Sequence, residues 1–282
     1  MSSEAPTALI LGGTGRTGSL LAGKLTRRGI ATRTASRRGA DVRFDWDDPA
    51  THADALAGVD RLYLVAPVLR VSYAGQVAGF LDLAEEAGVR HVTFLSTYNA
   101  GQAPEGIDIA AVEAGLAARQ TVTHSILRPA WVMQNFTDDH LPVAGGVITA
   151  PSGGGTEAFV DADDIAAVAA ETLLDPGAHA GAQYTLTGPQ ALTFGEAAGI
   201  IASVSGRPVR YNDIDQEAWI SGALAAGVPA DYAVMLRWLT GAIIAGHGST
   251  PTDDVEKVTG RTPATFRQFA ERNARAWTVE AK

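Results

Sequence analysis

The chain has 282 residues, enough for one large domain or for one domain with a smaller lobe. Its composition, 46% hydrophobic and 19% charged, is ordinary for a globular enzyme, and a formal net charge of −9 argues against a nucleic-acid-binding surface. The absence of cysteine excludes disulfides, thiolate nucleophiles and cysteine metal sites. No basic segment followed by an apolar segment stands at the start of the chain, so we expect no signal peptide, and we find no apolar run of membrane-spanning length. We therefore expect a cytoplasmic monomer or homodimer that binds neither nucleic acid nor membrane.

Apolar runs alternate with helical patterns through the first half of the chain. The expected strands are 8–11, 31–36, 42–44, 61–66, 91–96 and 124–127. The expected helices between them are 15–28, 51–56, 74–87 and 109–118. This alternation favours βαβ units and predicts an α/β protein with a doubly wound, parallel-sheet Rossmann domain.

The pattern changes after Pro129. A glycine-rich stretch at 145–155 indicates loops, a helix is expected over 161–174 and a strand over 183–187, and the remainder is mainly helical. We therefore predict a first domain over residues 1–150. A smaller, mainly helical lobe over 151–282 is expected to bind the substrate and to interleave partly with the first domain.

A glycine-rich turn follows the first expected strand and opens the first expected helix. Residues 12–18 read GGTGRTG, in the frame G-x-x-G-x-x-G. Glycines let a pyrophosphate approach the main chain, and the helix N-terminus offers free N–H groups. This setting predicts a dinucleotide site; the alternative is a tight turn without a ligand. The expected cofactor-binding residues of the turn are Gly12, Thr14, Gly15, Arg16, Thr17 and Gly18.

The end of the second expected strand distinguishes NADP from NAD. An acidic side chain there would accept from the ribose 2′-hydroxyl, whereas arginine accommodates the 2′-phosphate. The chain offers Ser36, Arg37 and Arg38, and no carboxylate until Asp41. Guanidinium suits phosphate because its planar fork donates two hydrogen bonds. We expect NADP(H) in preference to NAD(H), with Arg16 as a second cation; a solvated basic turn is the alternative.

Two further strand ends extend the expected cofactor site. Asp45 follows the third strand, where its carboxylate would accept from the adenine amine. Trp46 beside it either packs on the adenine or caps the core. Ala66 and Pro67 end the fourth strand, and such small residues would let the backbone pass close to the nicotinamide ribose.

Hydroxyl side chains end the fifth expected strand. Ser96 and Thr97 are expected beside the nicotinamide, and Tyr98 is the best-placed phenol to donate a proton to a reduced substrate. A lysine four residues later would lower the pKa of that phenol, but residue 102 is Gln. Tyr98 is therefore a candidate catalytic acid, with pocket wall or ordinary loop residue as the alternatives.

The remaining titratable residues point to no further site. The six histidines show neither metal-ligand spacing nor a triad, and we expect His91 and His124, at the starts of strands, on the surface. Asp161, Asp163 and Asp164 cluster in a first helical turn, where the helix dipole explains acidic residues. No metal site is expected.

Several segments together resemble the NmrA-like branch of the atypical short-chain dehydrogenase/reductase superfamily. They are LILGGTGRTG at 9–18, VTFLSTYNA at 92–100, SILRPAWVMQNF at 125–136, FVDADDIAAVAAETLLDP at 159–176 and YTLTGPQALTFGEAAGIIASVSGRPVRY at 184–211. SRRGADVRFDWDDPAT is similar to reductases of the iminium-reducing step in ergot-type alkaloid assembly. The resemblance implies NADP(H) across the sheet edge, a substrate between the two lobes, and a nicotinamide pocket lined by residues 128–136.

The resemblance also indicates the reaction. Quinone-reducing relatives often carry a lysine around residues 112–114, and this chain has none. The expected function is NADPH-dependent hydride transfer to a small electrophilic acceptor: a quinone, an imine or iminium ion, or an activated alkene or carbonyl, with secondary metabolism as one setting. The other hypothesis is a non-catalytic NAD(P) redox sensor that acts through a protein partner.

An aromatic or cyclic small molecule is the expected substrate. Aromatic and methionine side chains are the candidate walls of its pocket, although a core position is the alternative for each one taken singly. The candidates are Tyr98, Trp131, Met133, Phe136, Trp219 and Trp238.

Overall fold

The computed structural model describes residues 6–138 and 140–278, which divide into two compact units. Unit 1 contains the chain up to Val68 together with Ser72–Arg128 and Ala162–Thr185. Unit 2 contains Leu69–Val71, Pro129–Asp161 and the chain from Leu186 onward. The boundary predicted at residue 150 falls inside unit 2, because the chain leaves unit 1 after Arg128 and returns to it over Ala162–Thr185, which form a helix and a strand.

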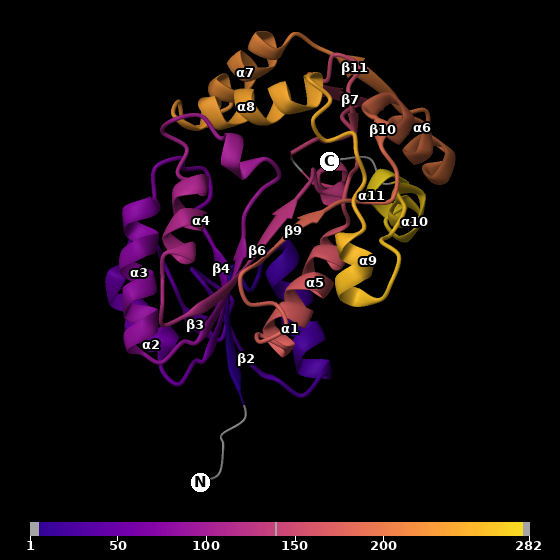
Figure 1. Ribbon diagram of the computed structural model, residues 1–282. Coiled ribbons are helices and arrows are strands. Elements are labelled where there is room, and N and C mark those ends of the chain that lie inside the picture. Colours follow the sequence, from indigo (N-terminus) through magenta and orange to yellow (C-terminus); the bar gives the residue numbers. More distant parts are fainter. Residues whose placement is uncertain (1–5, 139, 279–282) are drawn as a thin grey trace. The chain divides into compact units, whose positions relative to one another are not determined.

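Unit 1 is built on a sheet with the strand order β3-β2-β1-β4-β5-β6-β9 (Figure 1). The bounds are β1 Thr7–Leu11, β2 Ala31–Ser36, β3 Val42–Arg43, β4 Arg61–Val65, β5 His91–Leu95, β6 Thr123–Pro129 and β9 Ala182–Leu186. The ladders from β3 through β6 are all parallel. Consecutive strands run outward from β1 in both directions, so the doubly wound α/β sheet predicted from the sequence is confirmed.

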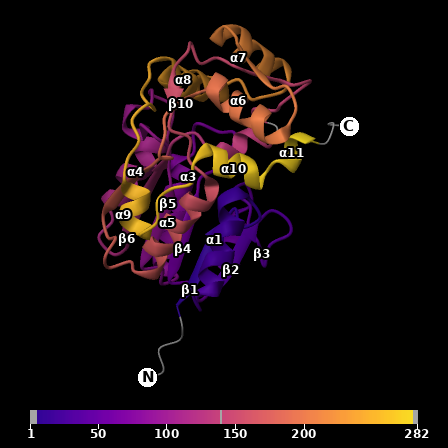
Figure 2. The same cartoon turned by 90° about the vertical axis from the view of Figure 1, so that its right-hand side faces the viewer.

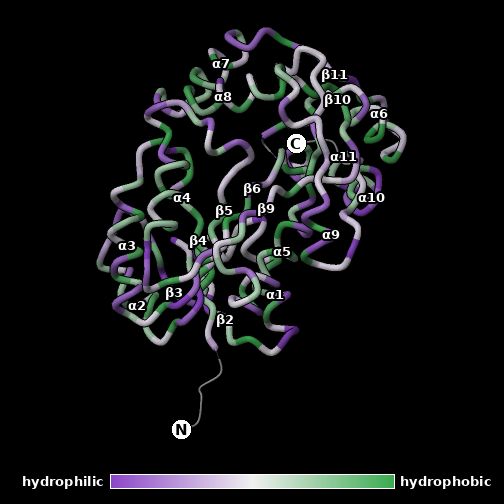
Figure 3. Tube along the Cα trace, viewed as in Figure 1, coloured by the Kyte–Doolittle hydropathy of each residue, from purple (hydrophilic) through white to green (hydrophobic). Residues whose placement is uncertain are grey.

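Helices cover both faces of this sheet. Helices α1 (Arg16–Arg27) and α5 (Ala162–Leu174) pack side by side on one face, in front of the strands in Figure 2. Helices α2 (His52–Leu56), α3 (Ala74–Glu86) and α4 (Ile109–Ala117) line the other face in Figure 1. Hydrophobic residues, green in Figure 3, follow the central strands and α5, as expected for elements enclosed between layers.

Unit 2 combines two small sheets with short helices. Strand β7 (Val147–Ala150) pairs in parallel with β11 (Arg210–Asp213), and β8 (Thr156–Glu157) pairs antiparallel with β10 (Leu192–Thr193). The helices are α6 Phe194–Ser205, α7 Gln216–Ala225, α8 Tyr232–Ile244, α9 Asp254–Thr259, α10 Phe266–Arg272 and α11 Arg275–Thr278. A short 3-10 helix of unit 2 occupies Met133–Phe136, and two of unit 1 occupy Pro49–Thr51 and Ala100–Gln102. Across the part of the chain that the structure describes, no helix is long and apolar enough to cross a membrane.

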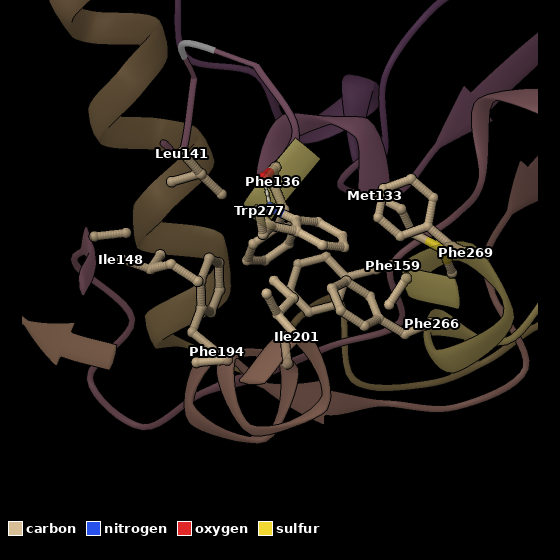
Figure 4. Close-up of a cluster of buried hydrophobic side chains, with 14 of the residues drawn as sticks. Met133, Phe136, Leu141, Ile148, Phe159, Phe194, Ile201, Phe266, Phe269 and Trp277 are labelled. Carbon is tan, nitrogen blue, oxygen red and sulfur yellow. Dashed lines mark hydrogen bonds between the residues drawn. The ribbon is translucent and has the colours of Figure 1, made fainter. Parts of the chain in front are cut away.

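Local sequence explains where the helices of unit 2 begin and end. Thr193 and Thr265 each form a capping box with the Glu or Gln three residues later, which satisfies free N–H groups at the starts of α6 and α10. Gly206 ends α6 in the left-handed conformation, where a side chain would be strained. An aromatic core lies between these helices (Figure 4), which fixes their packing.

Candidate functional site

The glycine turn leaves no room for side chains at its closest point. Gly12 directly follows β1 with φ +65°, and its carbonyl accepts the N–H of Gly15 at 2.8 Å. A Cβ on Gly18 would lie 2.8 Å from the carbonyl carbon of Gly12 and closer still to its oxygen. The N-terminal turn of α1 is thus pressed against the strand end, and a helix N-terminus in this position is suited to an anion.

One backbone and one side-chain hydrogen bond connect the turn and the start of α1 to the neighbouring strands of the sheet. Gly13 donates to the carbonyl of Ala35 at 3.1 Å, and a Cβ at Gly13 would lie 2.6 Å from Cβ of Thr34. The phenol of Tyr63, fully buried on β4, donates to Oγ1 of Thr17 at 3.0 Å. Burial raises the pKa of Tyr63, so it stays a neutral donor. We did not predict this role for Tyr63, and an apolar strand gives no signal for it.

The end of β2 carries free cationic side chains. Ser36 accepts from Thr14 at 3.2 Å and donates to the carbonyl of Arg38 at 2.7 Å. Arg37 and Arg38 are exposed, and neither guanidinium is ion-paired within residues 6–138 and 140–278.

The first carboxylate that follows this strand in the chain is already engaged. Asp41 accepts the backbone N–H of Thr34 at 2.8 Å and its hydroxyl at 2.7 Å, and these bonds lower the pKa of Asp41. Open backbone at the glycine turn and basic groups without a free acid at the end of β2 fit a dinucleotide that carries a 2′-phosphate.

Asp45 and Trp46 follow β3 at the same edge of the sheet. Oδ1 of Asp45 accepts the N–H of Asp47 at 3.2 Å, and Oδ2 lies 3.9 Å from the guanidinium of Arg43. The Trp46 ring packs edge-on against Phe44 and against Phe80 of α3, with ring centroids 5.1 and 5.3 Å apart. Trp46 therefore caps an aromatic cluster of unit 1, and its contact with an adenine remains a prediction.

A buried ion pair lies at the end of β5. Ser96 Oγ donates to Oε1 of Glu113 at 2.5 Å, and Arg128 on β6 donates to both carboxylate oxygens, at 3.0 and 2.5 Å. Glu113 is 7% exposed, and its hydrogen bonds raise the pKa of Arg128. Because the single hydroxyl hydrogen of Ser96 is committed to Glu113, Ser96 can only accept from a ligand.

This pair was not predicted from the sequence. Residues 112–114 were notable there only for the lack of a lysine, whereas the structure places the opposite charge, Glu113, in a buried position. The available signal was a lone acidic residue in the otherwise small and apolar helix α4, IAAVEAGLA.

The loops after β4 and β5 bring the other predicted residues to the carboxyl edge of the sheet. Pro67 is buried and Ala66 half-buried after β4. Thr97 and Tyr98 are half-buried after β5, where Asn99 turns the chain with φ +58°. Their contacts with cofactor and substrate remain predictions.

The candidate substrate residues of unit 2 fall into two groups. Met133 and Phe136 are each 1% exposed and belong to its aromatic core, where the carbonyl of Phe136 accepts from the indole N–H of Trp277 at 2.8 Å (Figure 4). Trp131, Trp219 and Trp238 are partly exposed. Trp131 packs edge-on against Phe194 of that core, with ring centroids 6.1 Å apart. The tryptophans thus offer accessible rings, while Met133 and Phe136 contribute packing.

The surface position predicted for His91 is wrong. His91 is 1% exposed because β5 is a central strand, and its Nδ1 lies 2.9 Å from Oγ1 of Thr123. Burial, reinforced by the positive charge of Arg61, lowers the pKa of His91 to about 4. The acidic cluster is likewise engaged in structure. Asp161 accepts from Gln134 at 2.8 Å and from Arg272.

These features define a dinucleotide-binding protein of the Rossmann type, with the glycine turn at the point where the strand order reverses. The chain belongs to the NmrA-like family, which matches residues 4–238 and confirms the resemblance. The uncharacterized oxidoreductase YesF of Bacillus subtilis is 37% identical over 96% of both chains. The NAD(P)H azoreductase of Xenophilus azovorans is 31% identical over 95% of this chain and 98% of its own.

A solved structure has the same fold. Citrobacter sp. triphenylmethane reductase, complexed with NADP(H), superposes with a TM-score of 0.71 and 24% identity. The match covers 95% of this chain and 99% of that one. The likeness therefore extends over both units.

Proposed function

We propose that the protein is an NADPH-dependent reductase of a small electrophilic organic acceptor. The observation that carries the proposal is the glycine turn beside a β2 end that offers two unpaired arginines and no free acid. The class of enzyme is confirmed by relatives that are named as oxidoreductases, one of them dependent on NAD(P)H. The protein is thus an NAD(P)H-dependent oxidoreductase, and the preference for NADPH and the kind of acceptor are the proposed parts.

Different residues of the chain bind different parts of the cofactor. The glycine turn at the start of α1 binds the pyrophosphate through backbone N–H groups other than those of Gly13 and Gly15, which bond to Ala35 and Gly12. Arg37 with Arg38 binds the 2′-phosphate. Ser96 and Thr97 lie toward the nicotinamide end, where the buried Glu113 fixes the Ser96 hydroxyl as an acceptor. NADPH supplies the hydride when bound. The protein contributes position and electrostatics.

The lack of a tyrosine–lysine pair supports acceptors that need little proton donation. Gln102 stands four residues after Tyr98, where the pair would require lysine. An iminium ion already carries positive charge, and a quinone is strongly electrophilic. We therefore propose that these two classes, and not simple ketones, are the preferred acceptors.

Arg37→Ala tests the cofactor assignment. We expect the affinity for NADPH to fall about tenfold to a hundredfold, the value of a lost charge-assisted hydrogen bond, with little change for NADH. Titration of nicotinamide fluorescence measures both dissociation constants. Arg27→Ala is the matched control, since Arg27 is an exposed arginine at the far end of α1 and its loss should leave both values unchanged. Equal weakening of NADPH and NADH in Arg37→Ala would contradict the assignment.

Tyr98→Phe separates the acceptor classes. With a quinone or iminium acceptor, kcat should fall by less than about tenfold, because little proton transfer is needed. With a carbonyl acceptor, the loss should reach about a hundredfold, as for a general acid. Steady-state rates at saturating NADPH give both numbers. A large loss with every acceptor would make Tyr98 a general catalytic acid and overturn the proposed preference.

A further inference from the structure

Unit 2 encloses a carboxyl group that none of its described neighbours neutralises. Glu157 on β8 is 2% exposed, and its Oε1 accepts a hydrogen bond from the backbone N–H of Trp131 at 3.3 Å. Burial raises the pKa of Glu157 to about 7, although the Trp131 N–H opposes the rise. An unpaired charge is costly in such a place, so this carboxyl is protonated at mildly acidic pH and ionises only in the neutral range.

The fold makes room for this carboxyl at Gly248. The N–H of Ala158 donates to the carbonyl of Gly248 at 2.9 Å, which brings that backbone against the side chain of Glu157. A Cβ on Gly248 would lie 2.5 Å from Oε1 and closer still to Oε2. Gly248 does not have a left-handed φ, so glycine is needed there only because a side chain would overlap the carboxyl group of Glu157. The carboxyl group of Glu157 therefore fills the space that the missing side chain of Gly248 leaves.

The Trp131 segment is otherwise held by its main chain. Ala130 donates to the carbonyl of Leu186 at 2.8 Å, the carbonyl of Trp131 accepts from Val160 at 2.9 Å, and Met133 donates to the carbonyl of Val160 at 2.8 Å. Between these bonds, the N–H of Trp131 relies on Glu157. Glu157 is thus the side chain through which a protonation change reaches this segment.

The elements that pack against β8 carry few titratable groups. Strand β10 places Leu192 opposite Glu157. Glu196 of α6 is bonded to Thr193 within the capping box. On α8, which also packs against β8, Arg237 pairs with Glu217, while Tyr232 is a phenol whose pKa burial raises; His247 adjoins Gly248. The pKa of Glu157 itself responds to its burial and to the Trp131 N–H.

We propose that Glu157 is a positioning residue that sets the place of the Trp131 ring through the Trp131 amide. The proposal rests on the proposed function and on the prediction from the sequence that Trp131 is a wall of the acceptor pocket. A carboxylate accepts a shorter and stronger hydrogen bond than a neutral carboxyl does. Ionisation of Glu157 therefore draws the Trp131 amide toward the carboxylate, and protonation releases it. The Trp131 segment thus has two positions, and their populations change across neutral pH.

Tryptophan fluorescence tests the two positions without any acceptor. The difference between the wild type and Trp131→Phe should titrate between pH 6 and 8 with a midpoint near 7. Glu157→Gln, which keeps the shape and the accepting oxygen but cannot ionise, should abolish this titration, whereas Glu157→Asp should keep a titration. Glu271→Gln, at an exposed carboxyl of the same unit, is the control and should leave the curve unchanged. A flat wild-type curve, or one that persists in Glu157→Gln, would overturn the proposal.

Kinetics test the positioning role. Between pH 6 and 8 the acceptor KM of the wild type should change about three- to tenfold, the range that one hydrogen bond of altered strength can produce. Glu157→Gln should hold KM at the low-pH value throughout, with kcat and NADPH affinity unchanged. A titrating fluorescence signal with a pH-independent KM would overturn the positioning role. If no acceptor is reduced, the proposed function fails, and the fluorescence titration alone decides whether Glu157 moves Trp131.

Discussion

Gly18→Ala should abolish NADPH binding and lower the free energy of unfolding by about 3 kcal/mol, the cost of forcing extra volume into a tightly packed place. The added Cβ would overlap the carbonyl of Gly12, and backbone at this point has no freedom to retreat because α1 is packed against α5. The start of α1 must then move away from the end of β1, and the N–H groups that face a pyrophosphate move with it. Urea unfolding and NADPH titration measure the two effects.

Gly79→Ala is the matched control for that experiment. Gly79 lies within helix α3, and a Cβ there meets nothing within 4 Å. Alanine is the better helix former by about 1 kcal/mol, so this variant should be as stable as the wild type or more so, with NADPH affinity unchanged. A Gly18→Ala protein that is as stable as Gly79→Ala and binds NADPH normally would show that the turn has room for a side chain at residue 18.

Glu113→Ala should lower the free energy of unfolding by about 3 kcal/mol, because breaking a buried pair leaves the other charge without its partner. Glu113 holds Ser96 and both donor atoms of Arg128, and it is the better buried member of the pair. Loss of the carboxylate also frees the Ser96 hydroxyl to donate. Chemical denaturation gives the stability, and the coupling in a double-mutant cycle with Arg128→Met should be large.

Glu217→Ala is the surface counterpart of this test. Glu217 and Arg237 also form a two-bond pair, at 2.7 and 2.8 Å, but both side chains are exposed. Water and salt screen such a pair, so we expect no measurable loss. Equal effects of Glu113→Ala and Glu217→Ala would show that the burial of Glu113 has no energetic consequence.

Patterns of local residues predicted most of unit 1. The strand 31–36 and the helix starts after Gly15 and Asp108 follow from apolar periodicity and chain-turning residues, so the structure and the sequence agree there within one residue. The doubly wound order followed because parallel strands joined by helices admit few topologies. The glycine turn was found for the same reason, since its chemistry lies in consecutive residues.

Long-range packing was beyond the sequence patterns. Nothing local to helix 162–174 indicates that it packs on α1, more than a hundred residues earlier, so the sequence predicted a partial interleaving of the two domains without indicating which segment returns to unit 1. The partners of Glu113 and Glu157 arrive from distant strands and loops, and a single carboxylate in a sequence does not reveal whether it is buried. His91 was placed on the surface because a strand start gives no sign of the layers that cover it.

The proposed reaction of this chain is the transfer of a hydride from bound NADPH to an electrophilic organic acceptor. The most direct measurement follows nicotinamide absorbance when the purified protein is mixed with NADPH and each of a panel of quinones, cyclic iminium ions, enones and ketones. We predict rapid oxidation of NADPH with quinones or iminium ions, slow or no reaction with ketones, and loss of the reaction in Gly18→Ala. Tight NADPH binding without oxidation by any acceptor would contradict the proposed function and favour a redox sensor that acts through a protein partner.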